Sequence, residues 1–125
     1  MSAGSLDIYI EQGVDFSMGL LFQDSSGNPV DLTGYTIAAQ IRAEYSDTTV
    51  LAQFAVTIDP DQVNNKGQAS LSLTNASTAA IPVDPATSFQ KKSTFYCWDA
   101  DYKRPDGTRV RFLEGTAEIS PEVTR

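Results

Sequence analysis

The most regular pattern in the chain reads Val14-Asp-Phe-Ser-Met-Gly-Leu-Leu-Phe-Gln-Asp-Ser-Ser-Gly-Asn-Pro-Val-Asp-Leu-Thr-Gly-Tyr-Thr-Ile-Ala-Ala-Gln-Ile-Arg42. Near its start the large apolar side chains fall at every second position, at Phe16, Met18, Leu20 and Phe22. Successive side chains of a β-strand point to opposite faces, so a period of two is typical of a strand that buries one face. Residues 14–23 are therefore predicted to form such a strand.

A polar turn leads from this strand to a second one of the same kind. Residues 24–29 are all turn formers, and Gly27 and Asn28 accept a positive φ at little cost. After the turn the apolar side chains alternate again, at Tyr35, Ile37, Ala39 and Ile41. Because each strand needs cover for its apolar face, the pattern predicts one shared core in an all-β domain.

Length and composition favour a single domain over residues 1–125. A chain of this length buries roughly two thirds of the surface that its unfolded form exposes, so it needs no disulfide or metal. Its apolar content of 41% comes in strand-length segments, which excludes a disordered chain and a transmembrane helix. Residues 1–5 and 122–125 are interpreted as terminal arms. Residues 1–5 do not resemble a secretory signal, so we expect no export by that route.

Charge and residue usage oppose several classes of function. The net charge of −7 disfavours binding to nucleic acid or to an anionic membrane. The absence of histidine removes the commonest general base and the commonest metal ligand. We therefore expect a protein that is not an enzyme and that holds no metal or cofactor. Cys97 cannot form an internal disulfide and is expected to be a small buried residue rather than a reactive thiol.

The other segments complete the predicted fold. Residues 74–81 give the only helical signal, where Thr74 or Asn75 caps a turn or two before Pro82. Everywhere else, turn signals separate short alternating segments, which is typical of a sandwich. The prediction is a single immunoglobulin-like β-sandwich of about seven strands, over residues 6–10, 14–23, 35–42, 51–58, 68–73, 95–103 and 108–119.

The clearest hairpin lies in the last third of the chain, at Arg104-Pro-Asp-Gly-Thr108. Pro105 suits the first position of a type I turn, and Gly107 suits the left-handed position that closes a three-residue loop. A bulge is expected near Gly115. The resulting register sets Lys103 opposite Arg109, Tyr102 opposite Val110, Asp101 opposite Arg111, Ala100 opposite Phe112 and Asp99 opposite Leu113.

One face of this hairpin is charged near its tip, which makes it a candidate for partner contact. Arg111 is interpreted as the cross-strand partner of Asp101. Lys103 faces Arg109, and two like charges in register indicate either a docking site for an acidic partner or a solvated tip. The loop 59–67 is the second candidate. The predicted partner-binding residues are Lys103, Arg104, Asp106, Arg109 and Arg111 in the hairpin, and Asp61, Asn64 and Lys66 in the loop.

Other chemistry fits the residues less well. A calcium loop that begins at Asp99 would need an oxygen ligand at Lys103, a glycine at Arg104 and a glutamate at Val110. An irregular carboxylate site stays open as an alternative to solvated turn carboxylates. Three aromatic side chains are interpreted as core residues rather than as a sugar-binding platform, namely Tyr96, Trp98 and Tyr102.

Several short motifs resemble a known group of proteins. They are Ile-Glu-Gln-Gly-Val-Asp-Phe at 10–16, Gln-Asp-Ser-Ser-Gly-Asn-Pro-Val-Asp-Leu-Thr-Gly-Tyr at 23–35, Pro-Asp-Gly at 105–107 and Leu-Glu-Gly-Thr-Ala-Glu-Ile at 113–119. In this order they resemble the small β-sandwich structural proteins of tailed bacteriophages. That group includes modules at the N-termini of baseplate upper proteins and sandwich domains encoded near tail-fibre genes. The segment 74–81 and the charged hairpin tip depart from the resemblance.

The resemblance implies a structural part of the virion rather than a catalyst. Such modules join other tail or baseplate proteins, usually as several copies around the tail axis, so a homo-oligomer is expected. No catalytic or ligand-binding residue is implied by the resemblance. Two alternative functions stay open: a capsid decoration (cement) protein, and a carbohydrate-binding or metal-dependent receptor module.

Overall fold

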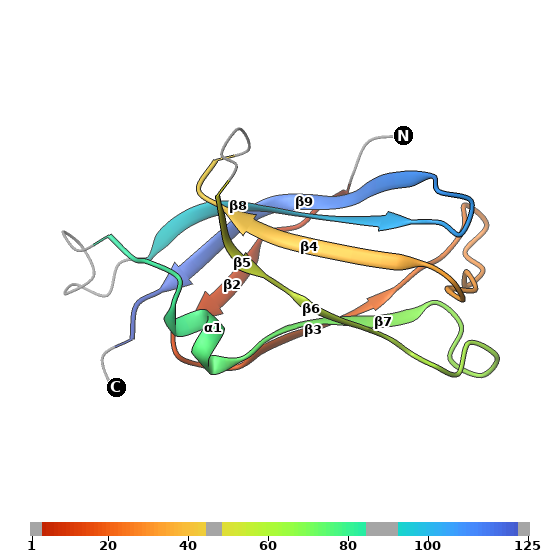
Figure 1. Ribbon diagram of the computed structural model, residues 1–125, viewed down its shortest axis with the longest axis horizontal. Helices are drawn as coiled ribbons and strands as arrows, with labels where there is room; N and C mark the ends of the chain where they lie inside the picture. The colour runs from red at the N-terminus through yellow and green to blue at the C-terminus, as the bar shows by residue number, and fades with distance from the viewer. Residues whose placement is uncertain (1–3, 45–48, 85–92, 123–125) are drawn as a thin grey trace.

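The alternating segments pair into two β-sheets that pack face to face, with one short helix at one end (Figure 1). The computed structural model describes residues 4–44, 49–84 and 93–122. The expected all-β sandwich is confirmed. Among these described residues, no helix has the length and hydropathy that crossing a membrane requires.

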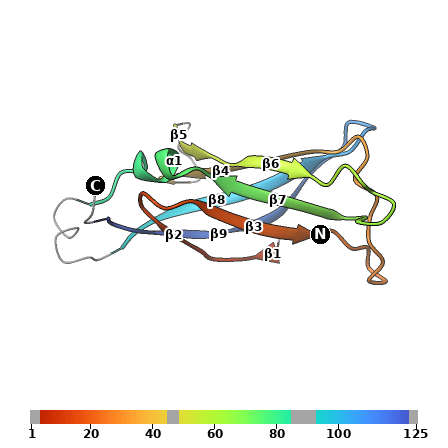
Figure 2. The same ribbon diagram turned by 90° about the horizontal axis from the view of Figure 1, so that it is seen from below.

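The larger sheet has the strand order β1-β9-β8-β4-β5, and β2 also pairs with β9. Its strands are β1 (Gly4–Ser5), β2 (Ile8–Glu11), β4 (Thr36–Arg42), β5 (Val50–Gln53), β8 (Thr94–Lys103) and β9 (Arg109–Ser120). The smaller sheet, which faces the viewer in Figure 2, has the order β3-β7-β6. Its strands are β3 (Phe16–Leu21), β6 (Ala55–Ile58) and β7 (Gln68–Leu73), and the helix α1 is Asn75–Ala79.

The described residues form nine strands instead of about seven, because one predicted strand is divided and one strand was not predicted. The unpredicted strand is β1, which precedes the predicted strand 6–10; residues 8–10 of that predicted strand lie in β2. The predicted strand 51–58 is interrupted at Phe54, where the chain leaves the larger sheet and enters the smaller one. Phe54 donates its N–H to the Ala39 carbonyl at 3.0 Å and its side chain is 4% exposed. The alternation therefore continues through the crossing while the pairing partner changes.

The N-terminal segment pairs in parallel with β9 and completes one edge of the larger sheet. Gly4 lies opposite Leu113, and Ile8 lies opposite Ala117. Gly4 and Ser5 are therefore strand residues and not part of an arm, because β9 offers them backbone hydrogen-bond partners. The rest of the two expected arms, residues 1–3 and 123–125, lies outside the described residues.

Trp98 ties this N-terminal segment to the core with a hydrogen bond that passes beside Gly115. Gly115 lies opposite Trp98, whose indole Nε1–H donates to the Leu6 carbonyl at 2.8 Å. A Cβ on Gly115 would overlap that carbonyl oxygen. The backbone of the N-terminal segment can approach β9 here only because residue 115 has no side chain.

The inward faces of both sheets form one core. The predicted inward side chains Ile37, Ala39 and Ile41 of β4 are all buried, which confirms the predicted face of that strand. The interpretation of Trp98 as a core residue is also confirmed, at 1% exposure. The other fully buried apolar side chains of large volume are Ile10, Leu32, Leu71, Ile81 and Ile119.

The predicted hairpin register is confirmed near the tip and wrong beyond it. The confirmed pairs are Asp101 with Arg111, Tyr102 with Val110, and Lys103 with Arg109. Farther from the tip, Ala100 lies opposite Leu113 instead of Phe112, and Asp99 lies opposite Glu114 instead of Leu113. The register shift skips Phe112, so it comes before the bulge expected near Gly115. Phe112 and Leu113 are consecutive apolar residues, and the shift lets both pack against the core.

The predicted helical turn is confirmed as α1. Thr74 is its N-cap, and the Thr74 hydroxyl accepts a hydrogen bond from the Ser77 N–H at 3.2 Å. The Thr78 side chain is fully buried: its hydroxyl donates to the Val14 carbonyl at 2.9 Å and accepts from the Gly13 N–H at 3.0 Å. These bonds fix the helix on the turn between β2 and β3.

Replacing Gly115 by alanine is expected to lower the free energy of unfolding by about 1–3 kcal/mol, the usual cost of overpacking. The added Cβ would push the Leu6 carbonyl, and with it the N-terminal segment, away from β9. Gly19→Ala is the matched control, because Gly19 also lies in a strand and a Cβ there meets nothing within 4 Å. Urea denaturation monitored by Trp98 fluorescence measures both. Equal stability of the two variants would refute the role given to Gly115.

Candidate docking surface

The hairpin between β8 and β9 ends in a well-defined exposed tip. The Arg104 N–H donates to the Thr108 carbonyl at 2.8 Å, and the Gly107 N–H donates to the Arg104 carbonyl at 2.9 Å. Asp106 accepts a hydrogen bond from the Thr108 N–H at 2.8 Å, which lowers the pKa of the Asp106 carboxyl. The predicted three-residue loop is confirmed, with Gly107 at a φ of 93°. Lys103 and Arg104 are thus presented on a short, hydrogen-bonded loop.

The loop 59–67, between β6 and β7, is held by two of its own candidate residues. Asp61 accepts from the Asn64 N–H at 3.0 Å, and the Asn64 side-chain amide donates to Asp61 at 2.9 Å. These hydrogen bonds lower the pKa of the Asp61 carboxyl. Asp61 and Asn64 therefore shape the loop, and Lys66 is the exposed cation among the predicted residues in it.

Gln62, which the sequence pattern did not single out, joins this loop to the connection between β3 and β4. Its side chain is buried, at 7% exposure. Its carbonyl oxygen accepts from the Leu32 N–H at 2.9 Å and from the Gly67 N–H at 3.1 Å. Its amide nitrogen donates to the Asp59 carbonyl at 2.7 Å. No periodicity marks a buried glutamine inside a polar loop, so nothing in the sequence identifies it.

Three connections meet at one end of the sandwich, which we call the loop end: residues 22–35, 59–67 and 104–108 (Figure 1, Figure 2). Gln62 joins the first two. Pro105 joins the third connection to the first, because it packs closely against Gly34. A Cβ placed on Gly34 would lie only 2.9 Å from the Pro105 Cγ. The hairpin tip and the loop 59–67, two separate candidates in the sequence, therefore belong to one surface.

An aromatic cluster supports the loop end from the core side. Its ring centroids lie 4.8 to 5.8 Å apart, and its members are Phe22, Tyr35, Tyr102 and Phe112. The Arg104 guanidinium lies 5.5 Å from the centroid of the Tyr102 ring and donates to its hydroxyl at 3.2 Å. Because its loops rest on packed rings, the loop end is preformed and does not need a partner to hold its shape.

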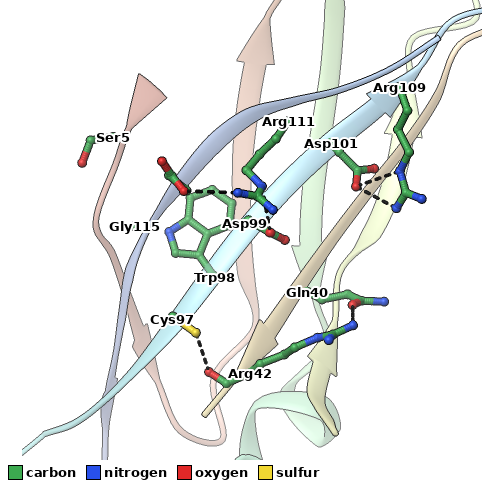
Figure 3. Close-up of a pocket in the computed structure, with 11 residues that line it drawn as sticks. Ser5, Gln40, Arg42, Cys97, Trp98, Asp99, Asp101, Arg109, Arg111 and Gly115 are labelled. Carbon is green, nitrogen blue, oxygen red and sulfur yellow. Dashed lines mark hydrogen bonds and ion pairs between the residues drawn. The ribbon is translucent and has the colours of Figure 1, made fainter. Parts of the chain in front are cut away.

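Beside the loop end, the outer face of the larger sheet holds a broad open hollow of about 750 Å³, the charged hollow (Figure 3). Its side chains come from β4, β8 and β9, with Ser5 of β1 at one border. Two of the predicted residues, Arg109 and Arg111, lie in it. The remaining lining residues are Gln40, Arg42, Cys97, Trp98, Asp99, Asp101, Glu114 and Gly115.

The ion pairs in the charged hollow differ from the predicted one. Arg109 lies 2.8 Å from the Asp101 carboxylate, while Arg111 lies 3.2 Å from Asp99 and 3.7 Å from Glu114. The expected pair of Arg111 with Asp101 is therefore wrong, although the two residues are opposite in the sheet. The shifted register brings Glu114 beside Asp99, so Arg111 has two carboxylates near it and Asp101 pairs with Arg109. All three pairs are on the surface, where an ion pair contributes little to stability.

Lys103 forms no ion pair with any described residue. Arg104 also lacks an ion pair among these residues, but its guanidinium lies over the Tyr102 ring and donates to the Tyr102 hydroxyl. Lys103 lies opposite Arg109, as predicted. Two like charges directly opposite each other on a sheet are destabilising. Asp101 neutralises Arg109, but the Lys103 ammonium stays exposed to solvent at the tip. An acidic partner would offset the repulsion at this point.

Cys97 lines the charged hollow and is half-buried rather than fully buried as expected. Its thiol donates to the Arg42 carbonyl at 3.2 Å. Burial raises the pKa of the thiol, and the nearby carboxylate of Asp99 raises it further. Only the thiolate is a strong nucleophile, so this environment disfavours reaction at Cys97.

The metal-site and sugar-platform alternatives can be compared with the described residues. Within the described parts of the chain, no group of three His, Cys, Asp or Glu side chains is placed to hold a metal ion. The aromatic residues weighed as a sugar platform are occupied elsewhere: Trp98 is in the core, and Tyr102 belongs to the cluster below the loop end. The Tyr96 hydroxyl donates to the Pro82 carbonyl at 2.6 Å.

The turn carboxylates are expected to make the stability dependent on pH. The folded-state pKa of Asp61 is lowered, so this group contributes stability above its unfolded value of about 4 and loses that contribution as the pH falls through the folded pKa. Asp61→Asn should therefore reduce the drop in melting temperature between about pH 5 and pH 2.5. Differential scanning calorimetry across this range measures the effect. An identical pH profile for the variant and the wild type would exclude this role.

Comparison with known proteins agrees with the fold. A family model described as LtfC-like, beta-sandwich domain matches residues 3–120. No curated protein matches the chain. One similar solved structure comes from a photo-crosslinking study of multimeric cell-adhesive interactions of VGSC beta subunits; it has 9% identity and a TM-score of 0.44, covering 98% of this chain and 96% of that chain. A likeness this distant implies no shared function. The family match spans both sheets and the whole loop end, so the chain belongs to the LtfC-like β-sandwich domain family.

Proposed function

We propose that this protein is a non-enzymatic structural component of a tailed-phage virion, associated with the tail and its fibres. The family match supports the proposal most directly, because LtfC is a phage tail-fibre-associated protein. The motifs at 10–16, 23–35 and 113–119 support it independently, since they resemble sandwich modules of phage tails and baseplates. The protein would then act by joining neighbouring virion proteins.

The loop end is the surface best suited to that role. Three connections form it, and the Gln62 hydrogen bonds and the aromatic cluster hold them together. A preformed surface loses little conformational entropy when it binds, so more of the contact energy remains as affinity. Lys66 and Lys103 are exposed on it, and each can pair with a carboxylate of the partner.

Immunogold electron microscopy of intact virions tests the location. An antibody against the protein should place gold on the tail or its fibres. Gold on the head would instead support the capsid decoration protein. Purified virions without any label would exclude a structural role in the particle.

Phage that carry Lys66→Ala together with Lys103→Ala are expected to incorporate fewer copies of the protein. Exposed ion pairs contribute up to about 1 kcal/mol each, so losing two lowers the affinity by up to about 30-fold. Quantitative mass spectrometry of purified virions measures the copy number.

The matched control is Ser17→Asp with Thr57→Asp, on the outer face of the smaller sheet. Both residues are exposed, and this double variant changes the net charge by the same amount as the lysine variant. It should leave incorporation unchanged. If the control lowers incorporation equally, net charge and not the loop end is responsible.

A further inference from the structure

A second hollow, of about 370 Å³, lies on the outer face of the larger sheet, far from the hairpin tip. We call it the aromatic hollow. Tyr9 of β2 and Phe95 of β8 both lie opposite Glu118 of β9, so a carboxylate stands between two aromatic side chains. Tyr9 is 50% and Phe95 62% exposed, so both rings are open to a partner. Asp7, Ile8 and Thr116 complete the lining.

The chemistry of the aromatic hollow suits a cation. Aromatic faces attract ammonium and guanidinium groups within about 6 Å of the ring centre. Neighbouring strands are about 4.8 Å apart, so the two aromatic residues start about 10 Å apart and a cation between them can reach both. Glu118 accepts from the Ser93 hydroxyl at 2.8 Å, and Asp7 accepts from the Thr116 N–H at 3.0 Å. Both carboxylates are therefore held in place, and the described residues that line the hollow include no lysine or arginine.

We propose that the aromatic hollow binds Lys103 from a second copy of this chain, so that copies associate head to tail. The proposal rests on the assembly role of the loop end and names its partner. Lys103 is an exposed tip cation that forms no ion pair among the described residues and, unlike Arg104, does not rest on the Tyr102 ring. The described residues that line the hollow include carboxylates but no lysine or arginine. Each side of the contact therefore supplies the charge that the other lacks.

Geometry requires that the lysine comes from another copy. Phe95 lies near the start of β8 and Lys103 at its end, about 26 Å apart at the rise of a strand. One molecule therefore cannot place its own Lys103 in its own hollow. The contact joins two different surfaces, so it is heterologous, and repeated copies form a closed ring or a filament. A ring around the tail axis is the arrangement that the proposed function needs.

A second copy fits better than a neutral saccharide. A sugar would stack on Tyr9 and Phe95, but it would leave the charges of Asp7 and Glu118 uncompensated in a contact that excludes water. A lysine side chain uses the rings and the carboxylates together. A narrow hairpin tip can also reach into a hollow that a broad protein face would only cover.

Sedimentation-velocity ultracentrifugation of the purified full chain tests the proposal. The wild type should associate, and its Kd should rise at least about tenfold when the salt concentration is raised from about 50 mM to about 500 mM. Lys103→Glu and Glu118→Lys should each abolish association, because like charges then meet at every contact. An equimolar mixture of the two variants should restore it, since alternating copies again pair opposite charges.

A second comparison separates the rings from the charges. Tyr9→Ala with Phe95→Ala should raise the Kd at least about tenfold, whereas Leu21→Ala, at a residue 55% exposed in β3, should leave it unchanged. All these side chains are exposed, so the variants should fold, and circular dichroism melts verify that they do.

Three outcomes would overturn the proposal. The first is a wild type that stays monomeric at about 100 μM, and the second is a mixture of charge variants that does not associate. The third is a monomeric chain whose Tyr9 and Phe95 NMR signals shift with maltoheptaose, which would assign the hollow to a saccharide. None of them depends on virion labelling, so the tail location and the head-to-tail contact fail or stand separately.

Discussion

The packing of Trp98 across Gly115 is the contact on which the larger sheet depends. The indole is the largest buried side chain, and its only polar atom donates to the Leu6 carbonyl. A buried N–H without a partner would cost free energy, so the N-terminal segment is held where the Leu6 carbonyl can accept this hydrogen bond. The same position lets β1 and β2 pair with β9 and places Tyr9 beside Glu118. One glycine thus connects the core to the outer face.

The loop end shows how polar connections become a defined surface. Gln62 is buried, and its amide satisfies backbone groups of two loops that would otherwise lack partners. Losing this side chain would leave the Leu32 and Gly67 N–H groups unpaired, which is costlier than losing an exposed bond. The stability of these loops is therefore coupled to the fold, and the backbone that carries Lys66 is held by these hydrogen bonds.

The sequence predicted what is local and missed what is long-range. The inward face of β4, a capped helical turn within residues 74–81 and the hairpin tip follow from neighbouring residues alone, and all agree with the structure. The crossing at Phe54 was invisible because alternation continues when a strand changes sheets. Parallel pairing of β2 with β9 brings together residues more than a hundred positions apart, so neither aromatic side chain could be assigned to the hollow.

The register shift at Phe112 has a local cause in the sequence. Phe112 and Leu113 are adjacent apolar residues in a strand that otherwise alternates, and both pack against the core. A regular strand would expose one of them to solvent, so a bulge at this point, which lets both pack inward, is favoured over a regular strand. The shift then decided the ion pairs of Arg111, which is why the predicted site had the right residues but the wrong partners.

The placement of charge argues for an oriented mode of association. Among the described residues, five of the six cations lie at the loop end or in the part of the charged hollow beside it, namely Lys66, Lys103, Arg104, Arg109 and Arg111. Around the aromatic hollow lie the carboxylates of Asp7, Glu11 and Glu118. With a net charge of −7, two copies side by side in the same direction would place like charges together. Exposed carboxylates also lie at the loop end, at Asp24, Asp31, Asp61 and Asp106. The attraction in a head-to-tail contact is therefore local, between Lys103 and the carboxylates of the aromatic hollow, and it opposes the repulsion of the whole molecules. Such an arrangement favours oriented growth over random aggregation.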